Sequence, residues 1–151
     1  MIERNHARRL LVRVEKARGR LLQPFFSSIG LTFGQGHARI LDSLRTRDHI
    51  TQKELADICR MDVTTMSRSL DRLEESGFLI RERDPGCRRS FLICLTKAGQ
   101  EEADKVRRIF DFADNQIWNG LSEEEMEQFC ATLETICDNL EHCDCKPDFE
   151  G

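Results

Sequence analysis

Hydroxyl and arginine side chains gather between Asp62 and Glu75, within a segment whose apolar residues follow a helical repeat. Met66, Leu70 and Leu73 recur at steps of four and three, so they share one face of the expected helix. The residues left on its outward face are Thr64, Thr65, Ser67, Arg68 and Arg72. Hydroxyls donate to phosphates and base edges, and an arginine pairs with guanine through two hydrogen bonds. We expect this face to contact double-stranded DNA, the alternative being an ordinary solvated helix face.

A second basic site follows that helix. Apolar residues alternate with polar ones over residues 78–95, which indicates a β-hairpin, and the Asp-Pro-Gly sequence at 84–86 has the composition of a turn. Arg88 and Arg89 come directly after the turn, so the hairpin tip is basic. An arginine at such a tip can enter a narrow minor groove, where negative potential is concentrated. We expect Arg88 and Arg89 to contact DNA, the alternative being a solvent-exposed tip.

Four helices are expected before the hairpin. The first covers residues 7–25 and should end or kink near Pro24, because proline removes a backbone donor. The second carries Ile40, Leu41 and Leu44. Thr51 and Glu54 form a capping box that opens a short third helix. The inward face of the third helix is expected to be Leu55 and Ile58. Asp62 caps the fourth helix, which carries the hydroxyls and arginines.

The order of these elements predicts the fold class. The second, third and fourth of these helices precede a hairpin with a basic tip, and a tight turn joins the third to the fourth. This order forms a winged helix-turn-helix. After the hairpin, Thr96 caps a long helix from about Lys97 to Trp118, and a capping box of Ser122 and Glu125 opens a final helix. We therefore expect a mainly α protein with a small two-stranded β-hairpin.

The composition fits one charge-rich, mostly helical domain. The chain has 151 residues, of which 39% are hydrophobic and 33% charged, and its net charge is −4. That total hides a gradient, since residues 1–33 carry +5, residues 34–97 carry +2 and residues 98–151 carry −11. The first two segments suit a phosphate-facing surface, with the acidic segment directed away from it.

Other function classes have little support. No stretch approaches the ~18 apolar residues that span a bilayer, and no secretory signal opens the chain, so we expect a cytoplasmic protein. The sequence has no glycine-rich phosphate loop, no His-Glu-x-x-His motif and no nucleophile beside a paired acid and base. We expect no enzymatic activity, no cofactor and no bound metal.

The seven cysteines lack the dense spacing of a disulfide scaffold, so reduced thiols are expected. Cys59 and Cys94 are expected to be buried and inert. Cys130 and Cys137 lie one heptad apart and are expected to fill a helix interface, with an intersubunit disulfide as the alternative.

Several motifs, in order, resemble the multiple-antibiotic-resistance regulator (MarR) family of bacterial transcription regulators over nearly the whole chain. They are Leu31-Thr32, Thr51–Ala56, Thr65–Arg68, Leu73–Leu79, Arg83-Asp84 and Leu95–Gly99. The family carries an Asp-x-Arg arrangement at its wing, in which the aspartate steadies a DNA-reading arginine. Here Arg89 matches that arginine and Cys87 stands in place of the aspartate, so Arg88 or Asp84 must compensate, or oxidation of Cys87 tunes DNA affinity.

The resemblance implies a homodimer on a pseudo-palindromic operator, with interlocking N- and C-terminal helices. The apolar residues from Met126 to Leu140 also follow the spacing of a coiled-coil seam. The expected interface residues are Leu10, Leu11, Val14, Met126, Phe129, Leu133, Ile136 and Leu140. Family members usually repress transcription, and many release DNA when a small molecule binds. The family's effector pocket would lie near Phe25, Phe26, His37 and Phe110.

We expect residues 34–97 to read DNA, residues 1–33 and 98–143 to dimerise, and residues 144–151 to form a flexible tail. Two alternatives stay open. One is a regulator of the same fold that responds to thiol oxidation or to metal through Cys87 or through Cys143 and Cys145 in the tail. A winged-helix module that binds proteins rather than DNA is the alternative of another class.

Overall fold

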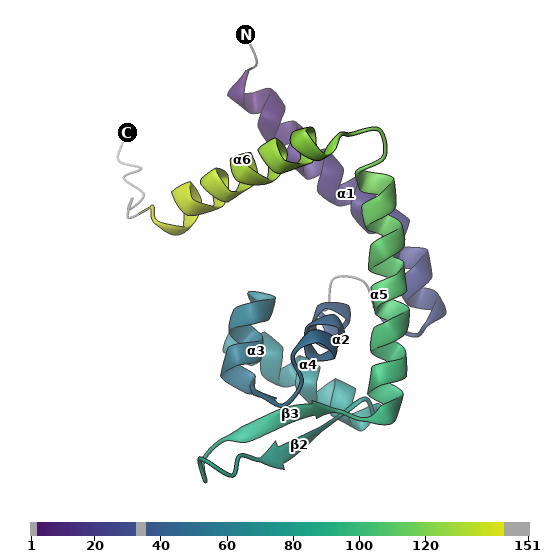
Figure 1. The fold of residues 1–151 in the computed structure, drawn as a ribbon, viewed down its shortest axis with the longest axis vertical. Coiled ribbons are helices and arrows are strands. Elements are labelled where there is room, and N and C mark those ends of the chain that lie inside the picture. Colours follow the sequence, from purple (N-terminus) through teal and green to yellow (C-terminus); the bar gives the residue numbers. More distant parts are fainter. Residues whose placement is uncertain (1–2, 33–35, 144–151) are drawn as a thin grey trace, which may run out of the picture. The chain divides into compact units, whose positions relative to one another are not determined.

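The computed structural model of the chain describes residues 3–32 and 36–143. The elements of these residues are α1 (Arg4–Ser28), α2 (His37–Thr46), β1 (Ile50–Thr51), α3 (Gln52–Cys59), α4 (Val63–Glu75), β2 (Leu79–Arg83), β3 (Phe91–Leu95), α5 (Lys97–Ile117) and α6 (Glu123–Glu141) (Figure 1). They belong to two units, residues 1–113 and residues 114–151. The mainly helical class and the winged helix order predicted from the sequence are confirmed.

Side-chain caps fix where the helices begin, as the sequence predicts. The Thr51 hydroxyl accepts the Glu54 backbone N–H at 3.2 Å, and the Glu54 carboxylate accepts the Thr51 N–H at 2.9 Å. Ser122 and Glu125 form the same reciprocal box at the start of α6. The Thr96 hydroxyl accepts the Gly99 N–H at 3.0 Å in the first turn of α5. These caps satisfy amides that have no partner inside their helices.

Two details of the helices differ from the prediction. α1 does not end at Pro24 but continues to Ser28. Its last turn is held from outside, because Phe26 packs edge-on against Phe110 of α5, with ring centroids 5.6 Å apart. In α3, Ile58 is 40% exposed, so its prediction as an inward residue is wrong. The inward face consists of Leu55, Ala56 and Cys59, which repeat at the spacing of one helical turn.

The sheet has three antiparallel strands in the order β1-β3-β2, one strand more than the predicted hairpin. β2 and β3 form the hairpin, with Leu79 paired to Leu95 and Arg83 paired to Phe91. β1 adds only two residues, and its Ile50 pairs with Ile93. A strand of two residues has no alternation for a sequence pattern to detect.

The apolar core lies among α2, α3, α4 and the inner face of the sheet. Its fully buried side chains include Ile40, Leu41, Leu44, Leu55, Met66, Leu70, Leu73 and Ile93. α1 adds Leu22 and Phe26, and α5 adds Val106. α5 also starts against the hairpin, because a Cβ at Gly99 would lie 1.8 Å from the carbonyl oxygen of Phe78. This packing fixes α4 and the hairpin in one unit.

α6 belongs to the second unit and is amphipathic, yet none of its residues is buried. Within this unit Trp118 meets Phe129 edge-on, with ring centroids 5.8 Å apart. Among the described residues, no helix combines the length and the apolar character needed to cross a membrane.

Candidate nucleic-acid interface

The outward face of α4 carries the side chains that the sequence analysis singles out. Met66, Leu70 and Leu73 are buried on the opposite face. Thr64, Thr65, Arg68 and Arg72 are exposed, and Ser67 is half-buried. Because the buried stripe anchors α4 in the core, the five predicted contact residues all lie on the side of the helix that solvent, or a groove of DNA, can reach.

The start of α4 is organised by Asp62. One Asp62 carboxylate oxygen accepts the Thr65 N–H at 2.9 Å, and the other accepts the Thr65 hydroxyl at 2.6 Å. The hydroxyl hydrogen bond from Thr65 and the bond from its N–H hold the pKa of Asp62 below the ordinary value. With its hydrogen given to Asp62, the Thr65 oxygen faces outward as an acceptor, which suits a base amino group.

His37, the first residue of α2, lies against this face. Together with Thr65, Arg68, Ser69 and Arg72 it lines a surface hollow of about 220 Å³. Burial lowers the pKa of His37, and the positive charge of Arg72 lowers it further. The structure thus brings three of the predicted DNA-contact residues together beside a neutral imidazole.

The hairpin tip is held by hydrogen bonds between side chains and main-chain groups. Asp84 uses its carboxylate inside the turn, where it accepts the Gly86 N–H at 2.8 Å. The Arg83 guanidinium donates to the Arg88 carbonyl at 3.3 Å, which holds the segment before Arg89. Cys87, Arg88 and Arg89 are exposed. The tip therefore presents both predicted arginines to solvent although it lacks the aspartate of the family's wing motif.

Arg81 of β2 ties the hairpin to α4, a role that the sequence does not predict. Its guanidinium bridges two acidic residues of α4, with 2.8 Å to the Asp71 carboxylate and a second ion pair to Glu74. The Arg81 side chain is 20% exposed. Because its partners lie seven and ten residues earlier in the chain, no local pattern marks this residue. The two expected DNA-contacting elements are thereby held at a fixed spacing.

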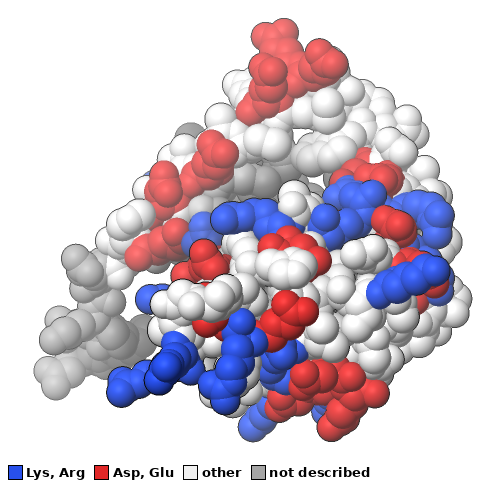
Figure 2. All heavy atoms as spheres, turned by 60° about the horizontal axis from the view of Figure 1, so that its bottom comes forward, with Lys and Arg blue, Asp and Glu red and all other residues white. Residues whose placement is uncertain are grey.

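Charge on the visible face is mixed. In Figure 2, Lys and Arg side chains gather at the lower left, and clusters of Asp and Glu lie between the basic side chains and elsewhere on the same face. Such a surface attracts phosphate locally even though the whole chain carries a net charge of −4.

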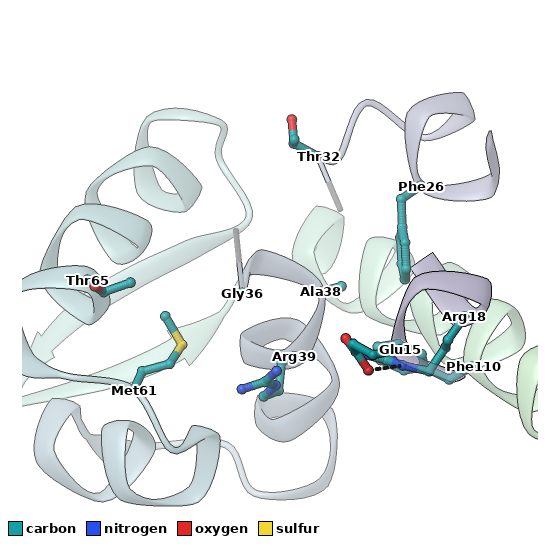
Figure 3. Close-up of a pocket in the computed structure, with 10 residues that line it drawn as sticks. All are labelled: Glu15, Arg18, Phe26, Thr32, Gly36, Ala38, Arg39, Met61, Thr65 and Phe110. Atoms are coloured by element: carbon teal, nitrogen blue, oxygen red, sulfur yellow. Dashed lines mark hydrogen bonds and ion pairs between the residues drawn. The ribbon is translucent and has the colours of Figure 1, made fainter. Parts of the chain in front are cut away.

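A separate cavity of about 330 Å³ lies between α1, α2, α5 and the start of α4 (Figure 3). Its lining residues are Glu15, Arg18, Phe26, Thr32, Gly36, Ala38, Arg39, Met61, Thr65 and Phe110. Of the four residues placed near an effector pocket by family resemblance, Phe26 and Phe110 line this cavity. Phe25 packs instead on Phe112, with ring centroids 5.0 Å apart, and His37 lines the hollow beside α4.

The cavity has an aromatic side and a charged side. Phe26 and Phe110 form the aromatic side, while Arg18 donates to the Glu15 carboxylate at 3.0 Å. That hydrogen bond from Arg18 keeps the pKa of Glu15 below its ordinary value. Arg39 donates to the Cys59 carbonyl at 2.8 Å. Thr65 belongs to both the cavity and the outward face of α4, so the two sites share a residue.

The expected dimer residues lie on surfaces that the single chain leaves uncovered. Leu10, Leu11 and Val14 are exposed on α1. On α6, Phe129, Ile136 and Leu140 are exposed, while Met126 and Leu133 are half-buried.

The described cysteines divide by exposure, and only the expected burial of Cys59 and Cys94 is confirmed. Cys59 and Cys94 are buried. Cys87, Cys130, Cys137 and Cys143 are exposed. Cys145 and the expected flexible tail lie outside the described residues.

The fold and the arrangement of α4 with the hairpin define a winged helix protein. The MarR family model matches residues 35–91. The chain is 33% identical over 101 residues to the multiple antibiotic resistance protein MarR of Escherichia coli, which covers 67% of this chain and 69% of that protein. It is 30% identical over 86 residues to the HTH-type transcriptional regulator BilQ of Clostridium symbiosum, covering 57% of this chain and 60% of BilQ.

A solved structure also resembles this chain. A cysteine-to-serine mutant of Escherichia coli MarR, complexed with operator DNA, superposes with a TM-score of 0.73 at 26% identity, covering 85% of this chain and 91% of that one. The chain belongs to the MarR family of transcription regulators.

Proposed function

We propose that this protein is a homodimeric regulator that binds a pseudo-palindromic operator in double-stranded DNA. Each α4 enters a major groove with Thr64, Thr65, Ser67, Arg68 and Arg72, and each hairpin places Arg88 and Arg89 in the adjacent minor groove. The observation that carries the proposal is the exposed hydroxyl and arginine face of α4, joined to the hairpin through Arg81. The relative of known structure bound to operator DNA supports it.

Dimerisation supplies the second α4 that a two-fold operator requires. The exposed apolar residues of α1 and α6 are the support, because amphipathic helices normally bury such stripes. In this proposal a second copy of the chain covers them. Residues 34–97 then form the DNA-reading part, residues 1–33 and 98–143 the dimerisation part, and the protein works in the cytoplasm.

We further propose that the protein is a repressor released by a small molecule. The cavity beside α4 offers an aromatic wall and arginines, and Thr65 connects it to the DNA-reading face. A ligand that prefers the form of the dimer unable to bind DNA by ~1–3 kcal/mol weakens DNA affinity roughly 5- to 150-fold. Differential binding of this size needs only a modest change at the start of α4.

A thiol-responsive regulator is the second candidate, and one observation favours it. Cys87 is exposed at the hairpin tip, directly before Arg88 and Arg89. Oxidation there adds bulk and polarity next to the proposed minor-groove contact. If Cys87 is the sensor, peroxide should abolish DNA binding. The Cys87→Ser variant should keep its DNA binding under peroxide, whereas a variant with serine at Cys143 and Cys145 should still lose it.

The test is binding to duplex DNA from the region upstream of the protein's own gene, with and without reductant. We expect affinity to fall roughly a hundredfold or more between about 50 mM and about 200 mM salt if some four phosphates are neutralised. DNA affinity that is the same with and without reductant favours the regulator released by a small molecule. DNA affinity that changes with reductant favours the thiol-responsive regulator that uses Cys87. Absence of binding to any duplex at low salt, with the protein folded and reduced, would leave a protein-interaction module as the better explanation.

A further inference from the structure

Three potential metal ligands meet at the root of the hairpin. Asp48 and His49 precede β1, and Cys94 lies on β3. One ligand atom from each residue lies within 4.8 Å of the others. The sequence gives no hint of this cluster, because the thiol lies some 45 residues from the other two and reads as an inert buried cysteine.

Asp48 and His49 already have nearly the spacing of ligands on one ion. An Asp48 carboxylate oxygen, Oδ1, accepts the backbone N–H groups of Leu95 and His49, each at 3.0 Å. The other oxygen, Oδ2, lies 3.4 Å from the His49 Nδ1 atom. Two ligands bonded at about 2.0–2.1 Å to a tetrahedral Zn²⁺ lie about 3.3–3.4 Å apart, so this pair needs little adjustment.

The backbone holds the imidazole in place. His49 has φ of 56°, in the left-handed region that residues other than glycine seldom adopt. Residues in such conformations persist where the surrounding structure imposes them, and they gather at ligand sites. Here the Asp48 carboxylate receives the His49 N–H and so fixes the bend that carries the ring.

Cys94 occupies an unusual environment for a structural thiol. It is 2% exposed, yet it does not belong to the apolar core cluster, to which its neighbours Ile93 and Leu95 belong. Burial, followed by the carboxylates of Glu82 and Asp48, raises the pKa of Cys94 to about 11. The thiol therefore lies against the Asp48 carboxylate and the His49 imidazole rather than inside the apolar cluster.

We propose that Asp48, His49 and Cys94 bind a zinc ion. Thiolate and imidazole select Zn²⁺ over Mg²⁺ or Ca²⁺, which prefer oxygen ligands alone. On binding, the Cys94 thiol gives its proton to solvent. The ion joins the segment between α2 and β1 to strand β3 of the hairpin. The proposal concerns metal binding alone and does not depend on DNA binding.

The experiment titrates Zn²⁺ into the full-length, reduced, metal-stripped protein against a chromophoric chelator, and Co²⁺ into the same protein to record its absorption spectrum. All variants carry serine at Cys143 and Cys145, because the tail offers competing thiols. Asp48→Asn keeps the oxygen that accepts the Leu95 N–H while weakening metal binding. His49→Asn suits the left-handed backbone. Cys59→Ser is the matched control, a second buried thiol outside the cluster.

We expect one zinc ion per chain, a thiolate-to-cobalt charge-transfer band, and a higher melting temperature with Zn²⁺. Asp48→Asn and His49→Asn should each weaken Zn²⁺ binding at least tenfold, and Cys94→Ser should abolish the charge-transfer band. Cys59→Ser should leave all three readouts unchanged. The proposal is overturned if zinc binding disappears once Cys143 and Cys145 are replaced. It is also overturned if Asp48→Asn and Cys94→Ser, shown by circular dichroism to be folded, bind Zn²⁺ as tightly as the control.

Discussion

Arg68 and Arg89 are the residues on which the DNA-binding proposal depends most. Arg68 lies on the exposed face of α4 and lines the hollow beside His37, while Arg89 lies at the exposed hairpin tip. They belong to different elements and are expected to read different grooves. Their effects on binding should therefore be separable.

Replacing Arg68 with alanine should cost about 1–3 kcal/mol of binding free energy and relax sequence preference at one base pair of each half-site. Arg89→Ala should weaken binding by a similar or smaller amount, mostly through lost minor-groove electrostatics. Fluorescence anisotropy with the operator and with mismatched duplexes measures both effects. Arg108→Ala, an exposed arginine of α5, is the control and should bind as the unmodified protein does.

His37 should make stability depend on pH. Burial and Arg72 lower its pKa, so the folded protein holds the imidazole neutral while the unfolded chain takes up a proton near pH 6.5. The unfolded state thus binds more protons as the pH falls through that value, and stability decreases with it. We expect the melting temperature to fall between pH 7.5 and pH 5.5, and His37→Gln to reduce that fall.

The control for this prediction is His6→Gln, because His6 is exposed on α1. This variant should show the same loss of melting temperature as the unmodified protein. Equal losses in His37→Gln and His6→Gln would contradict the assignment of the effect to His37. The carboxylates whose pKa is lowered, such as Asp62 and Glu54, titrate below this pH window and do not disturb the comparison.

Residues whose roles follow from local spacing were predicted from the sequence. Residues whose roles depend on partners in another element were not. The outward face of α4 follows from the positions of Met66, Leu70 and Leu73, and the sequence alone assigned it. Arg81 escaped prediction because its acidic partners lie on another element. Asp48 and Cys94 escaped for the same reason, since only the pairing of β1 with β3 brings them together.

At the scale of elements, the connection between α4 and the hairpin sets how both would meet DNA. Arg81, whose side chain is 20% exposed, pairs with the exposed carboxylates of Asp71 and Glu74. These ion pairs contribute little to stability, about 0–1 kcal/mol. Their effect should appear in positioning instead, because a hairpin that moves relative to α4 loses the fixed spacing of the two contacts.

Arg81→Ala should therefore weaken operator binding several-fold while lowering the melting temperature by only a few degrees. The matched control is Arg45→Ala, which removes an exposed ion pair of 2.6 Å between Arg45 of α2 and Asp104 of α5 and so leaves the contact between α4 and the hairpin in place. It should change stability by a similar amount and leave DNA affinity intact. Should both variants bind DNA equally well, the connection has no positioning role.

Element boundaries with a chemical signal were predictable, and those without one were not. Thr51, Asp62 and Ser122 each mark a helix start through a side-chain cap, and the structure has all three. β1 gave no signal because two residues carry no period. The extension of α1 past Pro24 depends on aromatic packing against α5, which only the folded chain provides.

At the scale of the whole molecule, charge and apolar surface are divided along the chain. Residues 98–151 carry −11, whereas residues 1–97 are net positive, so the acidic total says little about the proposed DNA-reading part. The apolar stripes of α1 and α6 lie in the segments that flank that part. Dimerisation and DNA binding should therefore be separable by mutation, although the proposed operator requires both.

Leu11→Glu on α1 and Phe129→Glu on α6 should each convert a dimer to monomers. These side chains are 45% and 44% exposed in the single chain, and a charge in a closed interface loses both apolar burial and hydration. Loss of about 1.5–3 kcal/mol per side chain weakens the dimer at least tenfold. Sedimentation equilibrium measures the change, with Ile58→Glu, at 40% exposure on α3, as the control. Dimers that persist in both variants would place the interface elsewhere.

Sequence-specific recognition by a dimer of α4 helices and hairpins can be measured by selection from a pool of random DNA duplexes. We expect the protein to enrich an inverted repeat whose half-sites are centred about one helical turn, or a multiple of it, apart. We also expect the Arg68→Ala, Arg89→Ala double variant to enrich no such motif. If the folded, reduced protein enriches no motif, or if the double variant enriches the same repeat equally well, recognition by α4 and the hairpin is excluded.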